Sequence, residues 1–281
     1  MRFATIRTGN TLTAARIEGD RAILVDASDA VDAYLRRDRL TDIGETDART
    51  ADYACISRAP AHILCTGLNY RSHIEELGRP TPTYPTFFAK FPSTLTGPRD
   101  TIALPRISDH IDGEAELAVI VGQRLRRAGV EDANHAIAGY CVANDLSLRD
   151  WQHRTTEALQ GKVLDRSTPL GPVLVTPEEV DDARDLTVTF TVDGVEWQRG
   201  STGDLLFTPA ELLAYCSTFL TLEPGDVILT GTPGKTARAG RSLTPGRHLV
   251  TAIEGLGAAI NPTAADPLPD TRAVWREGGQ R

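Results

Sequence analysis

Residues 112–122 read DGEAELAVIVG, and this stretch decides the fold prediction for the chain. Two glutamates lead directly into a run of small and β-branched residues, which is typical of a strand buried in a sheet. Successive side chains of a strand point to opposite faces. One apolar face is therefore formed by Ala115, Leu117, Val119 and Val121. Glu114 and Glu116 share the other face, with their Cα atoms about 6.6 Å apart.

Further runs rich in β-branched residues predict strands along the rest of the chain. These strands are expected at residues 2–7, 11–18, 21–25, 63–67, 116–122, 142–146, 186–194, 225–231 and 248–255. Helices are expected at residues 29–40, 70–77, 149–159 and 209–219. The last has a clear start signal, because Thr208 precedes Pro209 and Glu211 follows at the third position. The pattern predicts an α+β fold dominated by β-structure.

A change in composition at Ala59-Pro60 predicts a domain boundary. We expect a small N-terminal domain over residues 1–58 and a catalytic domain over residues 59–261. The remainder, residues 262–281, is rich in proline and glycine and is expected to be a C-terminal tail.

Composition excludes several classes of protein. Thirty Lys and Arg against 38 Asp and Glu give a net charge of −8, which argues against nucleic-acid binding. No stretch approaches the ~20 continuous apolar residues of a membrane span, and the first residues lack the apolar core of a signal peptide. The four cysteines lie far apart without a CxxC spacing, which favours reduced thiols in a cytoplasmic protein.

Carboxylates near the quoted stretch suggest a metal site. Glu114 and Glu116 would repel each other on one strand face, and a divalent cation would remove that cost. Asp145 ends the apolar run AGYCVAND and is a candidate third ligand. Oxygen ligands suit magnesium, manganese or calcium. The alternatives are a solvated strand end with Lys or Arg partners for the glutamates and a helix cap for Asp145.

A histidine and a glutamate three residues apart suggest acid–base chemistry. His73 and Glu76 face the same side of the predicted helix 70–77, whereas Glu75 points elsewhere. A carboxylate beside an imidazole orients the ring for proton transfer, as a general base requires. The alternative is an exposed pair that contributes only a few tenths of a kcal/mol.

Two further segments are candidates for anion binding. Lys162, between Gly161 and Pro169, is either a surface lysine or a cation aimed at a substrate carboxylate. The N–H groups of Gly231 and Thr232, with the Thr232 hydroxyl, suit an anion, although an ordinary loop has the same composition. The nearby Gly-Lys-Thr at 234–236 lacks the earlier glycine of a phosphate loop, which argues against nucleotide hydrolysis.

Taken in order, six segments resemble the fumarylacetoacetate hydrolase (FAH) superfamily. They are GLNYRSHIEE, PTFFAKFPSTLTGP, DGEAELAVIVG, AGYCVANDLSLRDWQ, LQGKVLDRSTPLGP and LEPGDVILTGTP, between residues 62 and 261. The resemblance implies a mixed β-roll core, a small N-terminal β domain and a homodimer. It also implies an Mg²⁺ or Mn²⁺ site at Glu114, Glu116 and Asp145.

The resemblance assigns roles to further residues of this chain. It implies His73, Glu76 and Lys162 as catalytic residues, and Arg71, Gln152, Lys162 and Thr232 as substrate-binding residues. The chain departs from the family pattern after TGTP, where relatives continue with Gly-Val-Gly and this sequence reads Gly-Lys-Thr. That departure concerns the substrate-specificity loop and leaves the metal residues unchanged.

Members of this superfamily act on 2-oxo acids, so the resemblance implies a small-molecule 2-oxo acid substrate. The His–Glu pair favours hydrolysis of a C–C bond in an acylpyruvate, in which activated water attacks the distal carbonyl and pyruvate leaves as its enolate. Oxaloacetate decarboxylation and keto–enol isomerisation remain alternatives, because they use the same metal and anion contacts. A non-catalytic binding protein of this family is the alternative from another class.

Overall fold

The structure, a computed structural model, describes residues 1–57, 59–234 and 241–271. Lys235 and Thr236 of the loop that departs from the family pattern lie outside the described residues, as do residues 272–281 of the predicted tail. The fold is dominated by β-sheet, as the sequence pattern predicts. It is also mixed, as the family resemblance implies, because parallel pairs such as β18–β6 occur among antiparallel ones.

The described residues form a large sheet of eleven strands, in which β5 pairs with β1 outside the main strand order. Its other strands follow the order β4-β3-β2-β1-β15-β12-β11-β18-β6-β7. The strands are β1 Arg2–Thr8, β2 Thr11–Glu18, β3 Arg21–Val25, β4 Asp42–Asp47, β5 Tyr53–Ala54, β6 Ile63–Gly67, β7 Thr86–Lys90, β11 Ala115–Val121, β12 Ile137–Asn144, β15 Val173–Val175 and β18 Val227–Leu229.

A second sheet packs against the first, with the order β17-β16-β19-β20-β9 among the described residues. Its strands are β9 Ile102–Leu104, β16 Thr187–Val192, β17 Val195–Ser201, β19 His248–Ile253 and β20 Gly257–Ala265. Short pairs join β10 Ile111–Asp112 to β13 Ser147–Leu148, and β8 Leu95–Thr96 to β14 Thr168–Pro169.

The two faces of β11 divide as the alternation predicts. Leu117 and Val119 belong to the buried cluster that contains Phe190 of β16, between the two sheets. Ala118 and Ile120 belong to a second cluster on the opposite face. Because both faces are covered, the whole strand is buried, and anything charged at its start is held away from water.

The helices are α1 Ala30–Leu35, α2 Arg71–Glu76, α3 Val130–His135, α4 Arg149–Gln152 and α5 Pro209–Phe219. Helix α5 has the predicted bounds and a capping box between Thr208 and Glu211. The predicted helix 149–159 is wrong beyond Gln152. The Thr155 hydroxyl donates to the Glu157 carbonyl, a local bond that competes with the helix, and a 3₁₀ turn follows at Ala158–Gly161.

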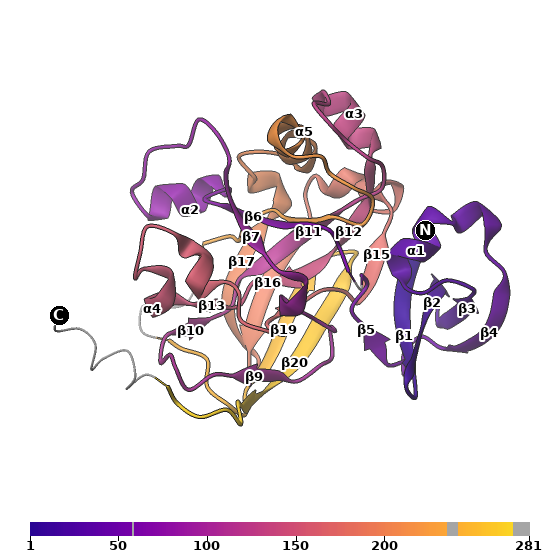
Figure 1. The fold of residues 1–281 in the computed structure, drawn as a ribbon, viewed down its shortest axis with the longest axis horizontal. Helices are drawn as coiled ribbons and strands as arrows, with labels where there is room; N and C mark the ends of the chain where they lie inside the picture. The colour runs from indigo at the N-terminus through magenta and orange to yellow at the C-terminus, as the bar shows by residue number, and fades with distance from the viewer. Residues whose placement is uncertain (58, 235–240, 272–281) are drawn as a thin grey trace.

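The N-terminal strands extend the large sheet at one end (Figure 1). Strand β1 pairs with β15, so backbone hydrogen bonds join the predicted N-terminal domain to the rest of the chain. The boundary at residue 58 therefore stays a prediction. Strand β20 reaches Ala265, so residues 262–265 of the predicted tail belong to a strand.

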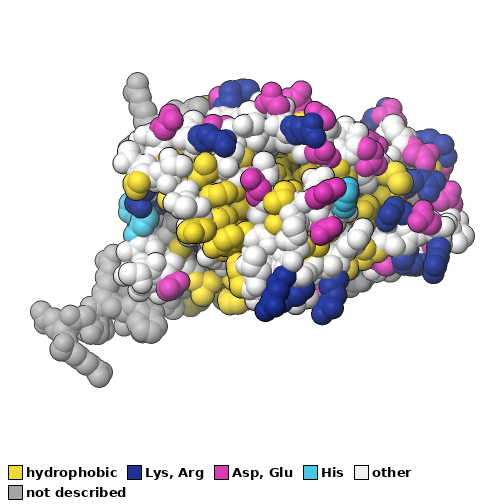
Figure 2. Space-filling view, turned by 90° about the horizontal axis from the view of Figure 1, so that it is seen from above, with side chains coloured by type: hydrophobic (Ala, Val, Ile, Leu, Met, Phe, Trp, Pro, Cys, Tyr) yellow, Lys and Arg dark blue, Asp and Glu magenta, His cyan; other side chains and the backbone are white. Residues whose placement is uncertain are grey.

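An aromatic cluster lies at the surface beside β7, the last strand of the large sheet. Phe87 stacks on Tyr215 with ring centroids 6.2 Å apart, and Phe219 meets Tyr215 edge-on at 6.0 Å. Tyr84 and Phe219 are exposed. Figure 2 shows hydrophobic side chains gathered on the side of the molecule where α5 lies.

The cysteines agree with the sequence-based prediction of free thiols, since Cys65, Cys141 and Cys216 are buried, Cys55 is half-buried and all four are unpaired. Among the described residues, no helix has both the length and the apolar character to cross a membrane.

Candidate active site

The three predicted metal ligands meet at the ends of β11 and β12. Antiparallel pairing places Glu116 opposite Ala143, and the Asp145 N–H donates to the Glu114 carbonyl at 2.9 Å. One carboxylate oxygen from each of Glu114, Glu116 and Asp145 lies within 4.8 Å of the other two. All three side chains are buried, so the strand end is not solvated, although Glu114 does have the Arg and Lys partners of that alternative.

Cations compensate two of these carboxylates. Arg149 and Lys162 contact Glu114 at 2.6 Å and 2.5 Å. Burial raises the pKa of Glu114, but the charges of Arg149 and Lys162 outweigh burial and lower it to about 2. Asp145 accepts from both Lys90 and Lys162, so each of its two oxygens has a cationic partner.

Glu116 differs from its neighbours. It accepts a hydrogen bond from the Gly231 N–H at 2.6 Å, and none of the ion pairs formed by the described residues includes it. Burial raises the pKa of Glu116 well above its usual range, and the negative charges of Asp145 and Glu114 raise it further. This carboxylate needs either a proton or an additional positive charge.

The donor set fits a hard divalent cation. Three carboxylates with no thiol or imidazole among them suit Mg²⁺, Mn²⁺ or Ca²⁺. Among the described residues, cations pair with Glu114 and with Asp145 but not with Glu116. A divalent ion at the triad would supply a positive charge beside Glu116.

Lys162 lies inside the site and is no surface residue. Its Nζ donates to Glu114 Oε2 at 2.5 Å and to Asp145 Oδ2 at 2.8 Å, and the side chain is buried. Burial lowers the pKa of Lys162, but the charges of Asp145 and Glu114 outweigh burial and raise it above its usual value. The lysine is therefore a fixed cation beside the triad.

Sequence reasoning missed two cations of this group, Lys90 and Arg149. Lys90 ends β7 and donates to Asp145 Oδ1 at 2.5 Å. Arg149 begins α4 and binds Asp112 Oδ2 through Nε and Nη2 at 2.9 Å and 2.7 Å. The available signal was a lysine closing the apolar run TFFAK and an arginine four residues after Asp145.

The predicted dyad forms on α2. His73 Nδ1 lies 3.0 Å from Glu76 Oε2, and the imidazole side chain is 20% exposed. Glu75 is exposed, as predicted. The helix is tied to the segment after β17, because the Ser72 N–H donates to Asp204 Oδ2 at 3.0 Å.

Arg71, a predicted substrate-binding residue, binds the protein itself. Its guanidinium donates to the backbone carbonyl of Leu205 and, at 3.3 Å, to that of Leu206. These bonds fasten the start of α2 beside the dyad. Gln152, another predicted substrate contact, accepts from Arg149 Nη1 at 2.9 Å, next to the acidic group.

The loop of residues 231–234 joins the triad to the dyad. The predicted anion cradle holds a carboxylate of the protein, since the Gly231 N–H donates to Glu116. Gly231 has φ of 94°, a conformation that favours glycine. The Thr232 hydroxyl donates to the Ala115 carbonyl at 2.9 Å and accepts from Gln198 at 2.9 Å. Gln198 had no signal in the sequence.

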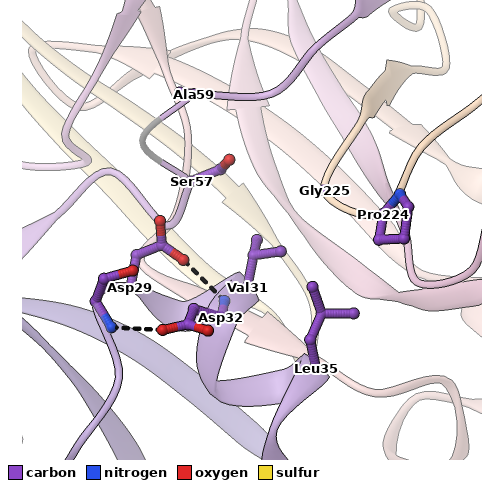
Figure 3. Close-up of a pocket in the computed structure, with 9 residues that line it drawn as sticks. Asp29, Val31, Asp32, Leu35, Ser57, Ala59, Pro224 and Gly225 are labelled. Atoms are coloured by element: carbon purple, nitrogen blue, oxygen red, sulfur yellow. Dashed lines mark hydrogen bonds between the residues drawn. The ribbon is translucent and has the colours of Figure 1, made fainter.

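A separate pocket of about 480 Å³ lies between α1 and the turn at Pro224-Gly225 (Figure 3). The two aspartates that line it accept hydrogen bonds from backbone N–H groups around the start of helix α1. The Asp32 N–H donates to Asp29 Oδ1 at 2.9 Å, and the Ser28 N–H donates to Asp32 Oδ2 at 2.9 Å. None of the predicted catalytic or metal residues lines this pocket.

Two relatives align with most of this chain. Human mitochondrial oxaloacetate tautomerase FAHD2A is 41% identical over 207 residues, which are 72% of this chain and 66% of that protein. The match thus spans a little under two thirds of the human protein. A protein named putative hydrolase from Burkholderia ambifaria is 38% identical over 250 residues, 82% of this chain and 87% of that protein.

Solved structures resemble the whole fold. The fumarylacetoacetate hydrolase of Exiguobacterium antarcticum gives a TM-score of 0.83 at 29% identity, over 95% of this chain and 100% of that one. A 5-carboxymethyl-2-hydroxymuconate delta-isomerase from Mycobacterium smegmatis gives 0.81 at 29% identity over the same shares, 95% and 100%.

The sequence profile described as fumarylacetoacetate (FAA) hydrolase, C-terminal, matches residues 62–264, which contain the triad, the dyad and Lys162. The six sequence segments, which run from residue 67 to residue 233, all lie within this span. The chain belongs to the fumarylacetoacetate hydrolase family.

Proposed function

We propose that this chain is a divalent-metal-dependent enzyme that interconverts the keto and enol forms of a 2-oxo acid, with oxaloacetate as the first candidate substrate. The observation that carries the proposal is the buried triad of Glu114, Glu116 and Asp145, in which Glu116 lacks a cationic partner among the described residues. The name of the human relative, oxaloacetate tautomerase, supports this choice of reaction.

Each group of the site has a task in this reaction. Glu114, Glu116 and Asp145 would hold Mg²⁺ or Mn²⁺, which would supply Lewis-acid stabilisation of negative charge on the substrate oxygen. His73, oriented by Glu76, takes the proton from carbon 3 of the keto form and delivers it to the oxygen on carbon 2, which gives the enol; the reverse transfer restores the keto form. Lys162 is a fixed cation for the substrate's acidic end.

The remaining proposed substrate contacts are Arg71, Gln152 and Thr232. Each already has a hydrogen-bond partner within the protein. Arg71 and Gln152 keep further donor capacity, since guanidinium and amide groups carry several N–H bonds. We propose that Arg71 and Gln152 bind the substrate through those remaining N–H groups.

Hydrolysis of a C–C bond in an acylpyruvate is the second candidate. It is favoured by the partial exposure of the His73 imidazole, 20%, which gives water access to the proposed base. In this reaction His73 takes a proton from water, which attacks the distal carbonyl, and pyruvate departs as its enolate. Oxaloacetate decarboxylation, the third reaction on this site, needs no base.

A substrate panel separates these reactions. Purified protein is treated with EDTA, dialysed, and assayed with oxaloacetate and a series of acylpyruvates, with and without Mg²⁺ or Mn²⁺. We expect metal-dependent keto–enol exchange of oxaloacetate that EDTA abolishes and added metal restores. Full turnover of the chelator-treated protein would contradict the metal assignment. Mg²⁺ binding without turnover of any substrate would favour the non-catalytic binding protein.

Two further predictions from the sequence concern assembly and location. We propose the homodimer that the family resemblance implies, which size-exclusion chromatography with light scattering tests directly. We also propose a cytoplasmic location, consistent with four unpaired cysteines.

A further inference from the structure

Gly234, the last described residue of the loop 231–234, lies against the dyad. A Cβ atom built at Gly234 would be 2.5 Å from Glu76 Oε2 and 3.4 Å from His73 Nδ1. Glu76 Oε2 is the atom that lies 3.0 Å from His73 Nδ1. A side chain at position 234 would therefore occupy the space in which Glu76 Oε2 contacts His73 Nδ1.

The collision would affect the dyad more than the stability of the fold. Glu76 has an exposed side chain, so its carboxylate can rotate into water when a methyl group takes its place. That rotation removes the carboxylate from the imidazole. The substitution would therefore disturb the orientation of the His73 imidazole more than the stability of the fold.

The loop is held from the other side, so it does not simply move away. Gln198 is buried, accepts from the Ala115 N–H at 2.9 Å, and donates to the Pro233 carbonyl at 3.1 Å. Pro233 also fills the space beside Gly200, where a Cβ would lie 2.5 Å from the proline Cβ. Residue 234 is thus fixed by its neighbour Pro233.

The same loop begins at the triad. Gly231 donates to Glu116, and three residues of chain reach no further than about 11 Å. We infer that Gly234 is a positioning residue of the dyad: the lack of a side chain at 234 lets Glu76 reach His73, and the loop 231–234 thereby fixes the dyad relative to Glu116. The catalytic consequence of this inference rests on the proposed function.

The test compares Gly234→Ala with Gly67→Ala. Gly67 is a matched control, because a Cβ there meets nothing within 4 Å. In these two variants and in Glu76→Ala we would record the imidazole NMR signals of His73 over a pH series, the affinity for Mg²⁺ by calorimetry, the thermal unfolding midpoint and turnover. For Gly234→Ala we expect His73 signals like those of Glu76→Ala, with Mg²⁺ affinity and unfolding midpoint unchanged. Gly67→Ala should match the wild type throughout.

A double variant shows whether Gly234 acts through Glu76. Turnover of Glu76→Ala/Gly234→Ala should equal that of Glu76→Ala, because the contact is already lost. Additive losses, or wild-type His73 signals in Gly234→Ala, would overturn the inference. If the wild type turns over none of the 2-oxo acids while Gly234→Ala still alters the His73 signals, the proposed function fails and the positioning role of Gly234 stands.

Discussion

Lys90 and Lys162 meet at a single carboxylate in the interior. Lys90 Nζ donates to Asp145 Oδ1 at 2.5 Å, and Lys162 Nζ donates to Asp145 Oδ2 at 2.8 Å. Lys90 also donates to the backbone carbonyl of Lys162 at 2.5 Å. Lys90 therefore fixes both a proposed metal ligand and the backbone that carries the proposed catalytic lysine.

Replacing Lys90 tests this arrangement. Lys90→Met keeps the side-chain length but leaves Asp145 with one cation instead of two. Removing one partner of a buried ion pair costs about 3–5 kcal/mol, so we expect a comparable loss in the free energy of unfolding. Urea denaturation measures this loss, and the exposed Arg124→Met should change stability by less than about 0.5 kcal/mol. Equal stability of the two variants would mean that the Lys90 contacts contribute nothing.

Substitutions at Glu116 and Glu75 compare a buried, proposed metal ligand with a surface charge. Glu116→Gln keeps an acceptor for the Gly231 N–H but removes the charge that a divalent ion requires. We expect Mg²⁺ binding to be lost in Glu116→Gln and unchanged in Glu75→Gln. Calorimetric titration of both variants checks this, and equal affinities would show that the strand-face assignment is wrong.

His73 distinguishes reactions that need a base from one that does not. His73→Ala should slow keto–enol exchange and acylpyruvate hydrolysis by ~10²–10⁴. Decarboxylation of oxaloacetate should fall much less, and Mg²⁺ affinity should stay at the wild-type value. His135→Ala, at the exposed end of α3, is the control. Loss of all three reactions with intact Mg²⁺ binding would indicate that His73 positions the substrate.

Asp100 should make the fold sensitive to acid. Burial raises the pKa of Asp100, but the Gly97 N–H, the Thr96 hydroxyl and Arg7 outweigh burial and lower it below its usual value. A lowered folded-state pKa means stability that is fully present above about pH 4 and is lost as the pH falls through the folded value.

Asp100→Asn should therefore be less stable than the wild type at pH 7. Hydrogen bonds to a charged group contribute about 1.5–3 kcal/mol, and we expect a loss of that size. The difference should shrink as the pH falls below about 4. Denaturation at several pH values measures it, with the exposed Asp20→Asn as control. A constant difference at all pH values would refute the charge argument.

Local patterns predicted much of the fold. The alternation in residues 115–121 assigned Leu117 and Ile120 to opposite faces, and the structure places them in separate cores. The start signal at Thr208 predicted α5 with its observed bounds. Both predictions depend on neighbours within a few residues, which the sequence shows directly.

Contacts between distant segments were not predictable in the same way. Gln198 joins the Ala115 N–H to the loop at Pro233, across separations of 83 and 35 residues. Nothing in the run around Gln198 distinguishes it from a surface glutamine. Helix α4 also ends earlier than predicted, and the chain beyond it turns back and places Gly161 against Gln152.

The sequence by itself determined which residues we propose to carry the chemistry, because Glu114, Glu116, Asp145, His73 and Glu76 stand in local patterns that a strand face or one helical turn explains. The tertiary structure alone decided their electrostatic state. Lys90 lies 55 residues from Asp145, and Lys162 lies 48 residues from Glu114. Only sheet pairing and burial bring these charges together, and burial makes each contact strong by excluding water.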